Sequence, residues 1–212
     1  MKKVLLALSL SAIFVSIANA QTTFGIHANV ISANQTWTEE GISLSPGSRI
    51  SWKAGIIANI PVATNLSFMP QLNLLNKGSK WEFETESSEL KLTYLELPLN
   101  FAYNSGGFFG GIGPVVSFGI SGSSVDKDGT DEYTTDIKFD GKENATSTDD
   151  YLHLKGLEVG GNIFAGYKLT SGLFFNASYN FGLSNISPDS GGSIKNSYFG
   201  FGVGYFFGGG TK

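Results

Sequence analysis

Hydrophobic residues alternate with small or polar residues along most of this chain. In residues 50–60, for example, Ile50, Trp52 and Ile56 fall on one face of an extended strand, and Lys53 falls on the other. Because the side chains of a strand point alternately to its two faces, this period of two predicts β-strands rather than helices. The pattern recurs in eight segments: 24–34, 50–60, 65–76, 90–104, 108–121, 157–169, 173–183 and 199–207.

The connections between these segments alternate between short and long. Three are tight turns rich in Pro, Asn, Ser and Gly: 61–65, 104–107 and 169–172. The others are longer and polar: 35–49, 77–89, 123–150 and 184–196. Outer-membrane barrels combine short periplasmic turns with longer external loops. The sequence therefore predicts an all-β fold, an eight-stranded antiparallel up-and-down transmembrane β-barrel, in which the first and last strands pair.

The two faces of the predicted strands differ in a way that favours a membrane protein. One face carries bulky Phe, Leu, Ile and Tyr, and the other carries mostly Gly, Ser and Asn. We expect the bulky face to point into lipid and the small face to fill the lumen. Two alternatives stay open: a soluble periplasmic lipocalin-like barrel that binds an apolar ligand in a greasy lumen, and a small pore. Eight strands disfavour the pore, because they leave an interior just wide enough for side chains.

Aromatic residues collect at the ends of the predicted strands. Tryptophans lie at the loop ends of the first three strands, and Tyr and Phe lie at the turn ends of the fourth, sixth and eighth. Two aromatic girdles at the membrane interfaces would produce this distribution. The predicted girdle residues are Trp37, Trp52, Trp81, Tyr103, Tyr167, Tyr205 and Phe207.

The start of the chain has the features of a cleavable signal peptide. Two lysines begin it, an apolar stretch follows, and Ala18-Asn19-Ala20 supplies a small-residue cleavage pattern. We expect residues 1–20 to be removed, so that the barrel domain spans 21–212 in the outer membrane. The chain has no cysteine, which excludes disulfides, thiolate metal sites and thiol catalysis.

Most of the negative charge lies in one segment. Residues 123–150 contain nine acidic residues and three lysines, a net charge of −6, whereas the formal net charge of the whole chain is −4. We expect this segment to be a solvated, mobile external loop. No basic patch is present that would recruit nucleic acid.

Four stretches carry a family resemblance: Tyr94-Leu95-Glu96-Leu97-Pro98-Leu99, Phe109-Gly110-Gly111-Ile112-Gly113-Pro114, Asn180-Phe181-Gly182-Leu183-Ser184-Asn185-Ile186, and 199–207. Together they resemble the PorT-like family of outer-membrane β-barrel domain proteins, small barrels common in Bacteroidetes. The resemblance implies the fold and the location in the outer membrane. Some relatives are linked to protein secretion, so a secretion-associated barrel is an alternative role. The tail 208–212 departs from the pattern, because many such barrels end on the aromatic residue.

Several ionisable residues fall on the predicted lumen face: His27, Lys53, Glu96, Glu158 and Lys168. A buried charge without a partner is costly. We expect Glu96 to pair with Lys53, and Arg49 is the competing partner. A structural polar network is favoured over a proton or ion path in so narrow a lumen.

The acidic segment also contains a weak candidate calcium site. Asp126, Asp128 and Asp131 are clustered carboxylates of the kind that hard cations bind. Their spacing does not match an EF-hand loop, because the third acidic residue follows the glycine. The pattern therefore favours a solvated loop over a specific site.

The sequence offers little for catalysis. His153, near Asp149 and Asp150, is the only candidate cluster, and a nucleophile with its base and orienting group is not evident around it. We therefore predict no enzyme and no cofactor. The expected role is that of a monomeric integral membrane protein, surrounded by outer-membrane lipid, that acts structurally or contacts a protein or surface partner through residues 77–89 and 123–150.

Overall fold

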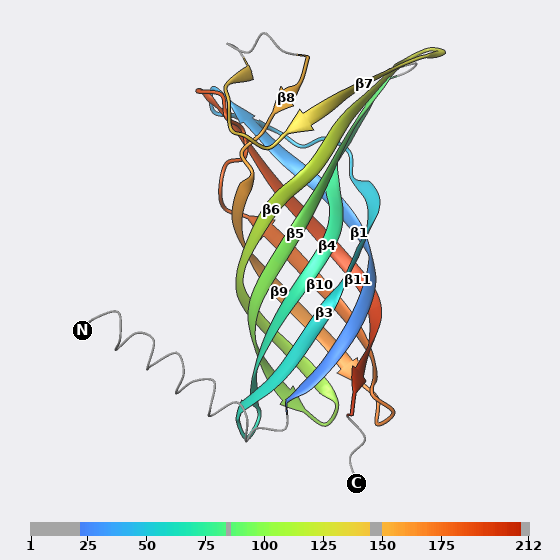
Figure 1. Cartoon of the computed structure of the whole chain (residues 1–212), viewed down its shortest axis with the longest axis vertical. Coiled ribbons are helices and arrows are strands. Elements are labelled where there is room, and N and C mark those ends of the chain that lie inside the picture. Colours follow the sequence, from blue (N-terminus) through green and yellow to red (C-terminus); the bar gives the residue numbers. More distant parts are fainter. Residues whose placement is uncertain (1–21, 84–85, 145–149, 209–212) are drawn as a thin grey trace, which may run out of the picture.

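Eight strands close into a barrel in the computed structural model, which describes residues 22–83, 86–144 and 150–208. The ring order is β1-β3-β4-β5-β6-β9-β10-β11, and its pairings are antiparallel (Figure 1). Within the described ranges no helix is long and apolar enough to span a membrane. The strands are β1 Thr23–Glu39, β2 Ile42–Leu44, β3 Arg49–Ala63, β4 Leu66–Phe83, β5 Glu86–Ser105, β6 Phe108–Asp128, β7 Asp131–Lys138, β8 Leu152–His153, β9 Leu157–Lys168, β10 Leu173–Gly182 and β11 Gly192–Phe207.

The barrel is closed by its first and last strands, as predicted. β1 pairs with β11 from Phe24 opposite Phe207 to Glu39 opposite Gly192. This closure satisfies the backbone groups that an open sheet edge would leave unpaired in hydrocarbon. The start of β1 and the end of β11 lie at the end of the barrel that carries the short turns (Figure 1). We call it the periplasmic end, because short turns face the periplasm in this class of barrel.

The turn between β5 and β6 shows how the sequence sets a tight connection. Ser105 pairs with Phe108, so only Gly106 and Gly107 join the strands. Their φ angles are 56° and 93°. Two positive φ values in a two-residue loop are what a type I′ hairpin needs, and glycine adopts them without steric cost.

The strands are longer than predicted, and two predicted loops are wrong. β4 continues through 77–83, and β5 begins at Glu86 and covers 86–89. β6 continues to Asp128 and turns back as β7, so 123–138 is mainly hairpin rather than loop. Charged composition suggested a loop, but a strand outside hydrocarbon tolerates charge on both faces. Only Gly129 and Thr130 join the two strands, and Gly129, with a φ of 56°, was a hairpin signal that the composition obscured.

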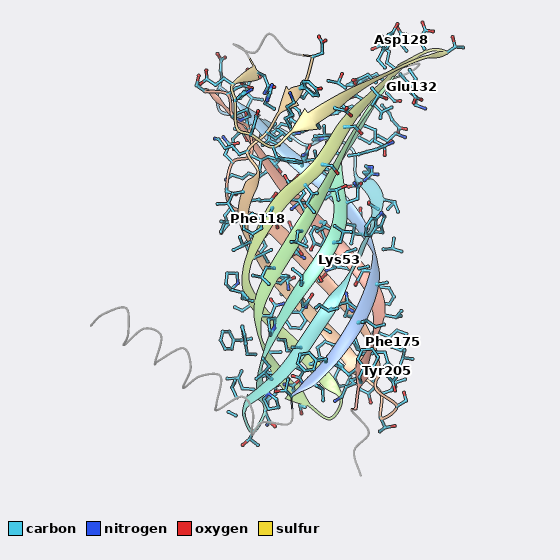
Figure 2. All side chains as sticks on the ribbon, viewed as in Figure 1. Lys53, Phe118, Asp128, Glu132, Phe175 and Tyr205 are labelled. Carbon is cyan, nitrogen blue, oxygen red and sulfur yellow. The ribbon has the colours of Figure 1, made fainter. Side chains whose placement is uncertain are left out.

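The orientation of the two faces confirms the membrane prediction. Phe24, Val30 and Ile112 are each more than 60% exposed on the barrel exterior. The neighbouring His27 and Asn29 are buried. Figure 2 shows aromatic side chains such as those labelled Phe118, Phe175 and Tyr205 projecting from the wall. A lipocalin-like barrel would need the opposite arrangement, with polar residues outside and an apolar lumen.

Aromatic rings also occupy the lumen, which the sequence pattern did not predict. Two of these rings lie against a glycine directly opposite them on the neighbouring strand. Phe109 is paired with Gly166 and Phe174 with Gly204. A Cβ added at either glycine would come within 2.3 Å of the ring. Small and large residues are therefore complementary inside the barrel, and the glycines make room for the rings.

The predicted signal peptide, residues 1–20, lies outside the described residues, as does the tail from residue 209 onward.

Candidate functional site

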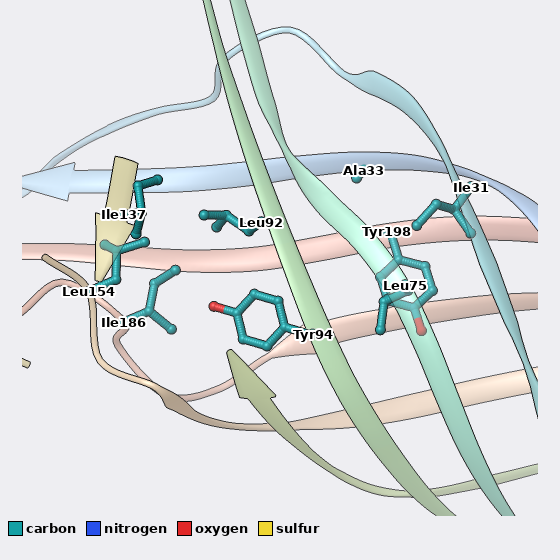
Figure 3. Close-up of a cluster of buried hydrophobic side chains, with 9 residues drawn as sticks. All are labelled: Ile31, Ala33, Leu75, Leu92, Tyr94, Ile137, Leu154, Ile186 and Tyr198. Atoms are coloured by element: carbon teal, nitrogen blue, oxygen red, sulfur yellow. The ribbon is translucent and has the colours of Figure 1, made fainter. Parts of the chain in front are cut away.

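Side chains fill the lumen in three layers. The periplasmic layer is apolar and contains Ile57, Met69, Ala102, Phe109, Phe164, Phe174 and Phe206. The middle layer is polar, and its buried residues include His27, Asn29, Lys53, Asn73, Lys77, Glu96, Glu158 and Asn196. The extracellular layer is again apolar and is drawn in Figure 3: Ile31, Ala33, Leu75, Leu92, Tyr94, Ile137, Leu154, Ile186 and Tyr198. Three of its members, Ile137, Leu154 and Ile186, come from segments that fold over the extracellular end rather than from the barrel wall.

A buried ion pair crosses the polar layer. Lys77 Nζ lies 2.8 Å from Glu158 Oε1, and both side chains are nearly inaccessible to solvent. Asn196 donates to the other Glu158 oxygen at 2.6 Å, and the Lys77 ammonium lies 4.1 Å from the centre of the Tyr94 ring. Each charge therefore has several partners, which a buried pair requires. Lys77 was missed because the predicted third strand ended one residue earlier; extending the alternation from Asn73 through Leu75 would have found it.

The predicted pair of Glu96 with Lys53 is not a direct contact. Glu96 Oε1 instead accepts a hydrogen bond from the Tyr198 hydroxyl at 2.7 Å. Lys53 Nζ lies 5.2 Å from the centre of the same Tyr198 ring and 3.4 Å from Ser178 Oγ. The tyrosine thus stands between the two charges. Tyr198 lies on the last strand. Extending the alternation of residues 199–207 by one residue would have placed its side chain in the lumen.

Arg49, the competing partner, lies outside this layer. Its guanidinium contacts Glu89 and Asn76. The Glu89 carboxyl is partly desolvated, which acts to raise its pKa, but hydrogen bonds from Arg49 and Lys91 outweigh this effect and hold the pKa below its ordinary value. The pair fastens the extracellular ends of β3 and β5.

His27 belongs to a chain of amides across the lumen. Its Nδ1 lies 2.9 Å from Asn29 Oδ1 and its Nε2 lies 3.0 Å from Asn73 Oδ1. Asn29 donates to Asn176 on β10 at 2.6 Å, and Asn73 donates to Glu96 on β5 at 3.4 Å. This chain links four strands of the wall through side chains alone; Asn176 is half-buried and the other members are buried.

The lumen has little free volume. The two cavities lined by the polar layer measure about 20 Å³ beside His27 and Lys53 and about 10 Å³ beside Lys77 and Glu158. Each is close to the space that one water molecule needs. A larger hollow of about 370 Å³ opens at the periplasmic mouth, where Lys168 lies 5.9 Å from the centre of the Phe206 ring. The side chains therefore leave no continuous channel through the described lumen.

A cap covers the extracellular end of the barrel; we define it as residues 137–144, 150–156 and 183–191. His153 is buried in it, with Nδ1 2.7 Å from Asp140 Oδ1. Asn144 hydrogen-bonds to the His153 backbone and to Asp189. Asp140 is therefore an acidic partner of this histidine that the sequence did not suggest. Of the two aspartates that the sequence placed near it, Asp149 lies outside the described residues. These hydrogen bonds join the segments of the cap to one another and so hold the cap in place.

The pKa of Asp140 reports the same contact. Desolvation of its carboxyl acts to raise the pKa, but hydrogen bonds from His153 and from the backbone N–H of Lys142 lower it overall. The ionised form is therefore favoured by the folded cap.

Beyond the barrel rim, β4, β5, β6 and β7 continue as a sheet that projects from the extracellular end (Figure 1). We call it the projecting sheet. The candidate calcium ligands lie at its tip: Asp128 pairs directly with Asp131, and Asp126 lies two residues before Asp128. Among the described residues, no group of three or more His, Asp or Glu side chains is arranged to hold a metal ion.

The predicted girdle residues divide into two groups. Trp52 and four residues at the periplasmic end are exposed on the barrel exterior, the latter being Tyr103, Tyr167, Tyr205 and Phe207. Trp37 and Trp81 instead continue the inward-facing rows of β1 and β4 above the rim. Their rings meet edge to face, with centroids 6.4 Å apart. These two tryptophans therefore pack against each other rather than face lipid.

Comparison with solved structures gives distant likenesses to outer-membrane and surface proteins. Ail, the attachment invasion locus protein of Yersinia pestis, is 10% identical with a TM-score of 0.46, covering 87% of this chain and 99% of Ail. Neisserial surface protein A is 10% identical with a TM-score of 0.47, covering 86% and 96%. The outer membrane protease OmpT from Escherichia coli is 12% identical with a TM-score of 0.33, covering 88% and 96%. Likenesses this distant say nothing about what the chain binds or does.

No match was found among curated proteins. The sequence profile described as "Outer membrane protein beta-barrel domain" matches residues 16–187, which is most of the chain. This match agrees with the ring of eight antiparallel strands and the outward-facing apolar rows. The chain therefore belongs to the outer membrane protein β-barrel domain family.

Proposed function

We propose that this protein is a closed outer-membrane barrel that anchors a structured surface outside the cell and acts through contacts made there, without catalysis. One observation carries the proposal: the lumen is packed between the hollow at its periplasmic mouth and the cap, while the strands continue well beyond the barrel rim. A packed lumen serves stability rather than transport. Strands outside the membrane are needed only if that surface has a role.

The polar layer supports a structural role for the lumen. Its charged groups contact other side chains, as the Lys77–Glu158 pair and the Glu96–Tyr198 hydrogen bond illustrate. A transport path needs sites that a solute can enter and leave. Here the charged groups that would bind a solute contact other side chains of the lumen.

The finer points of the proposal rest on the sequence. A cleavable signal peptide over residues 1–20 would deliver the chain for export. Membership of the PorT-like branch is supported by the Tyr94–Leu99 and Phe109–Pro114 stretches, which lie on β5 and β6. We propose a monomer in the membrane, because β1 and β11 complete the wall within one chain.

Conductance across planar lipid bilayers tests the closed-lumen proposal. The purified, folded full-length chain should give no discrete conductance steps. Glu96→Gln should lower barrel stability and leave the bilayers equally silent. Reproducible steps from the wild-type chain, altered by Glu96→Gln, would instead establish a pore and overturn the proposal.

A further inference from the structure

The inward face of the projecting sheet has an organised chemistry of its own. Trp81, Ser88, Asp126 and Tyr133 are direct neighbours across β4, β5, β6 and β7, so their side chains form one row on one face. The next row outward, on the same face, is Phe83, Glu86, Asp128 and Asp131. We call this the aromatic–acidic face. Figure 1 shows the sheet rising clear of the cap, and Figure 2 labels Asp128 at its tip.

Aromatic rings bound this face at both edges. Trp81 and Phe83 stack on β4 with centroids 6.2 Å apart and an interplanar angle of 12°. Tyr133 stands on β7 at the other edge and is 64% exposed. These three aromatic residues line a groove of about 460 Å³ together with the carboxylates of Glu86, Asp126 and Asp128. Ser87, Ser88 and Lys127, which is paired with Glu132, complete its lining. Exposed rings beside carboxylates are suited to cations, which both ring faces and carboxylates attract.

The carboxylates on this face are not neutralised. Glu86 and Asp131 each stand directly opposite Asp128, and like charges directly opposite one another destabilise a sheet. In the described part of the chain, neither these three nor Asp126 takes part in an ion pair. The other face differs, because its Glu132 is paired with Lys127 at 2.7 Å and its Glu82 with Lys80. The unfavourable charge is thus confined to one face.

We propose that the aromatic–acidic face binds a basic, extended polypeptide segment that carries Lys or Arg at alternate positions. This inference rests on the proposed function and names the partner class. Charge complementarity selects a cationic partner over a second copy of this acidic chain. Three strand spacings separate β4 from β7, roughly 14 Å. A chain of four or five extended residues crosses that width, and its alternate side chains, roughly 6.7 Å apart, would all point toward the sheet.

Fluorescence anisotropy with a labelled peptide of four Arg-Ser repeats tests the proposal. The partner is the full-length chain folded in uncharged detergent, and a peptide of four Glu-Ser repeats is the negative control. The wild-type chain should bind the basic peptide only. Asp126→Asn/Asp128→Asn/Asp131→Asn should weaken binding by about tenfold or more, since several exposed charge contacts are lost together.

A matched control variant distinguishes binding at this face from a general attraction of the basic peptide to an acidic protein. Glu82→Gln/Glu132→Gln/Asp136→Asn removes the same charge from the opposite face of the same sheet, and binding should change by less than about threefold. Phe83→Ser/Tyr133→Ser leaves the charge unchanged and should still weaken binding by about fivefold. Equal losses in the two charge variants, no loss in the aromatic variant, or no binding by the wild type would each overturn the proposal. A chain that binds no peptide yet gives no conductance would leave the closed-barrel function standing.

Discussion

Lys77 on β4 and Glu158 on β9 are joined across the lumen at 2.8 Å, although β5 and β6 separate their strands in the wall. Backbone pairing connects only neighbouring strands. The contacts that hold distant strands together are therefore side-chain contacts inside the barrel. The hydrogen bond from Tyr198 on β11 to Glu96 on β5 is a second brace of this kind.

Breaking the buried ion pair should be costly. Lys77→Met leaves the Glu158 carboxylate buried without its cation, and we expect the free energy of unfolding to fall by about 3–5 kcal/mol. Urea titration of the barrel folded in liposomes, followed by tryptophan fluorescence, measures the change. Adding Glu158→Gln should restore much of the loss. As a control, Lys127→Met in the exposed pair with Glu132 should leave stability nearly unchanged; similar losses at the two lysines would refute the bracing role.

Close packing of β5 against β6 predicts the effect of a single methyl group. A Cβ at Gly111 would come within 1.8 Å of the Phe101 carbonyl oxygen. Gly111→Ala should therefore cost about 1–3 kcal/mol through a backbone shift, or reduce the folded fraction. Gly192→Ala meets nothing nearer than 3.9 Å and should be tolerated. Heat-modifiable gel mobility reports folded barrel for both variants; equal yields would argue against this packing.

The cap should loosen in acid. The folded-state pKa of Asp140 is lowered, because hydrogen bonds from His153 and Lys142 outweigh desolvation. A lowered carboxylate pKa stabilises the fold above the unfolded value, near 4, and this stability is lost as the pH falls through the folded-state pKa. Hydrogen exchange at the Gly141 and Leu154 amides, which bond within the cap, should therefore accelerate below about pH 4 after correction for intrinsic rates.

Asp140→Asn is the matching variant. It should already show weaker protection of those two amides at neutral pH, and it should lack the acid-dependent loss. Unchanged protection in this variant at pH 7 would mean that the Asp140–His153 contact does not hold the cap.

The barrel was predictable from sequence because lipid imposes a strict rule. Every second residue of a spanning strand must be apolar, and Ile50, Trp52 and Ile56 obey it without interruption. Outside hydrocarbon an apolar residue is not required at every second position. The strand continuations at 77–83 and 123–128 therefore lack the alternation, and the sequence predicted loops there. There the backbone pairing persists while the side-chain pattern becomes polar.

The lumen contacts were less predictable, because they depend on register. Placing Tyr198 beside Glu96 requires knowing the stagger of all eight strands, which alternation does not contain. β5 and β6 also shift register between Thr93 and Tyr94, and this bulge moves the lumen-facing set of β6 from odd to even residues. The rings of Phe109 and Phe174 could have been found from their glycine partners once the strand pairs were known.

The outward orientation of the apolar rows can be measured directly on β1. The chain contains no cysteine, so single cysteines at successive positions from Ile26 to Ile31 accept one nitroxide label each. In liposomes, labels at Ile26, Ala28 and Val30 should be accessible to oxygen dissolved in the lipid, whereas labels at the intervening positions should be shielded from oxygen and from a water-soluble nickel reagent. The reverse alternation, with the even positions shielded and the odd ones reached by oxygen, would contradict the barrel described above.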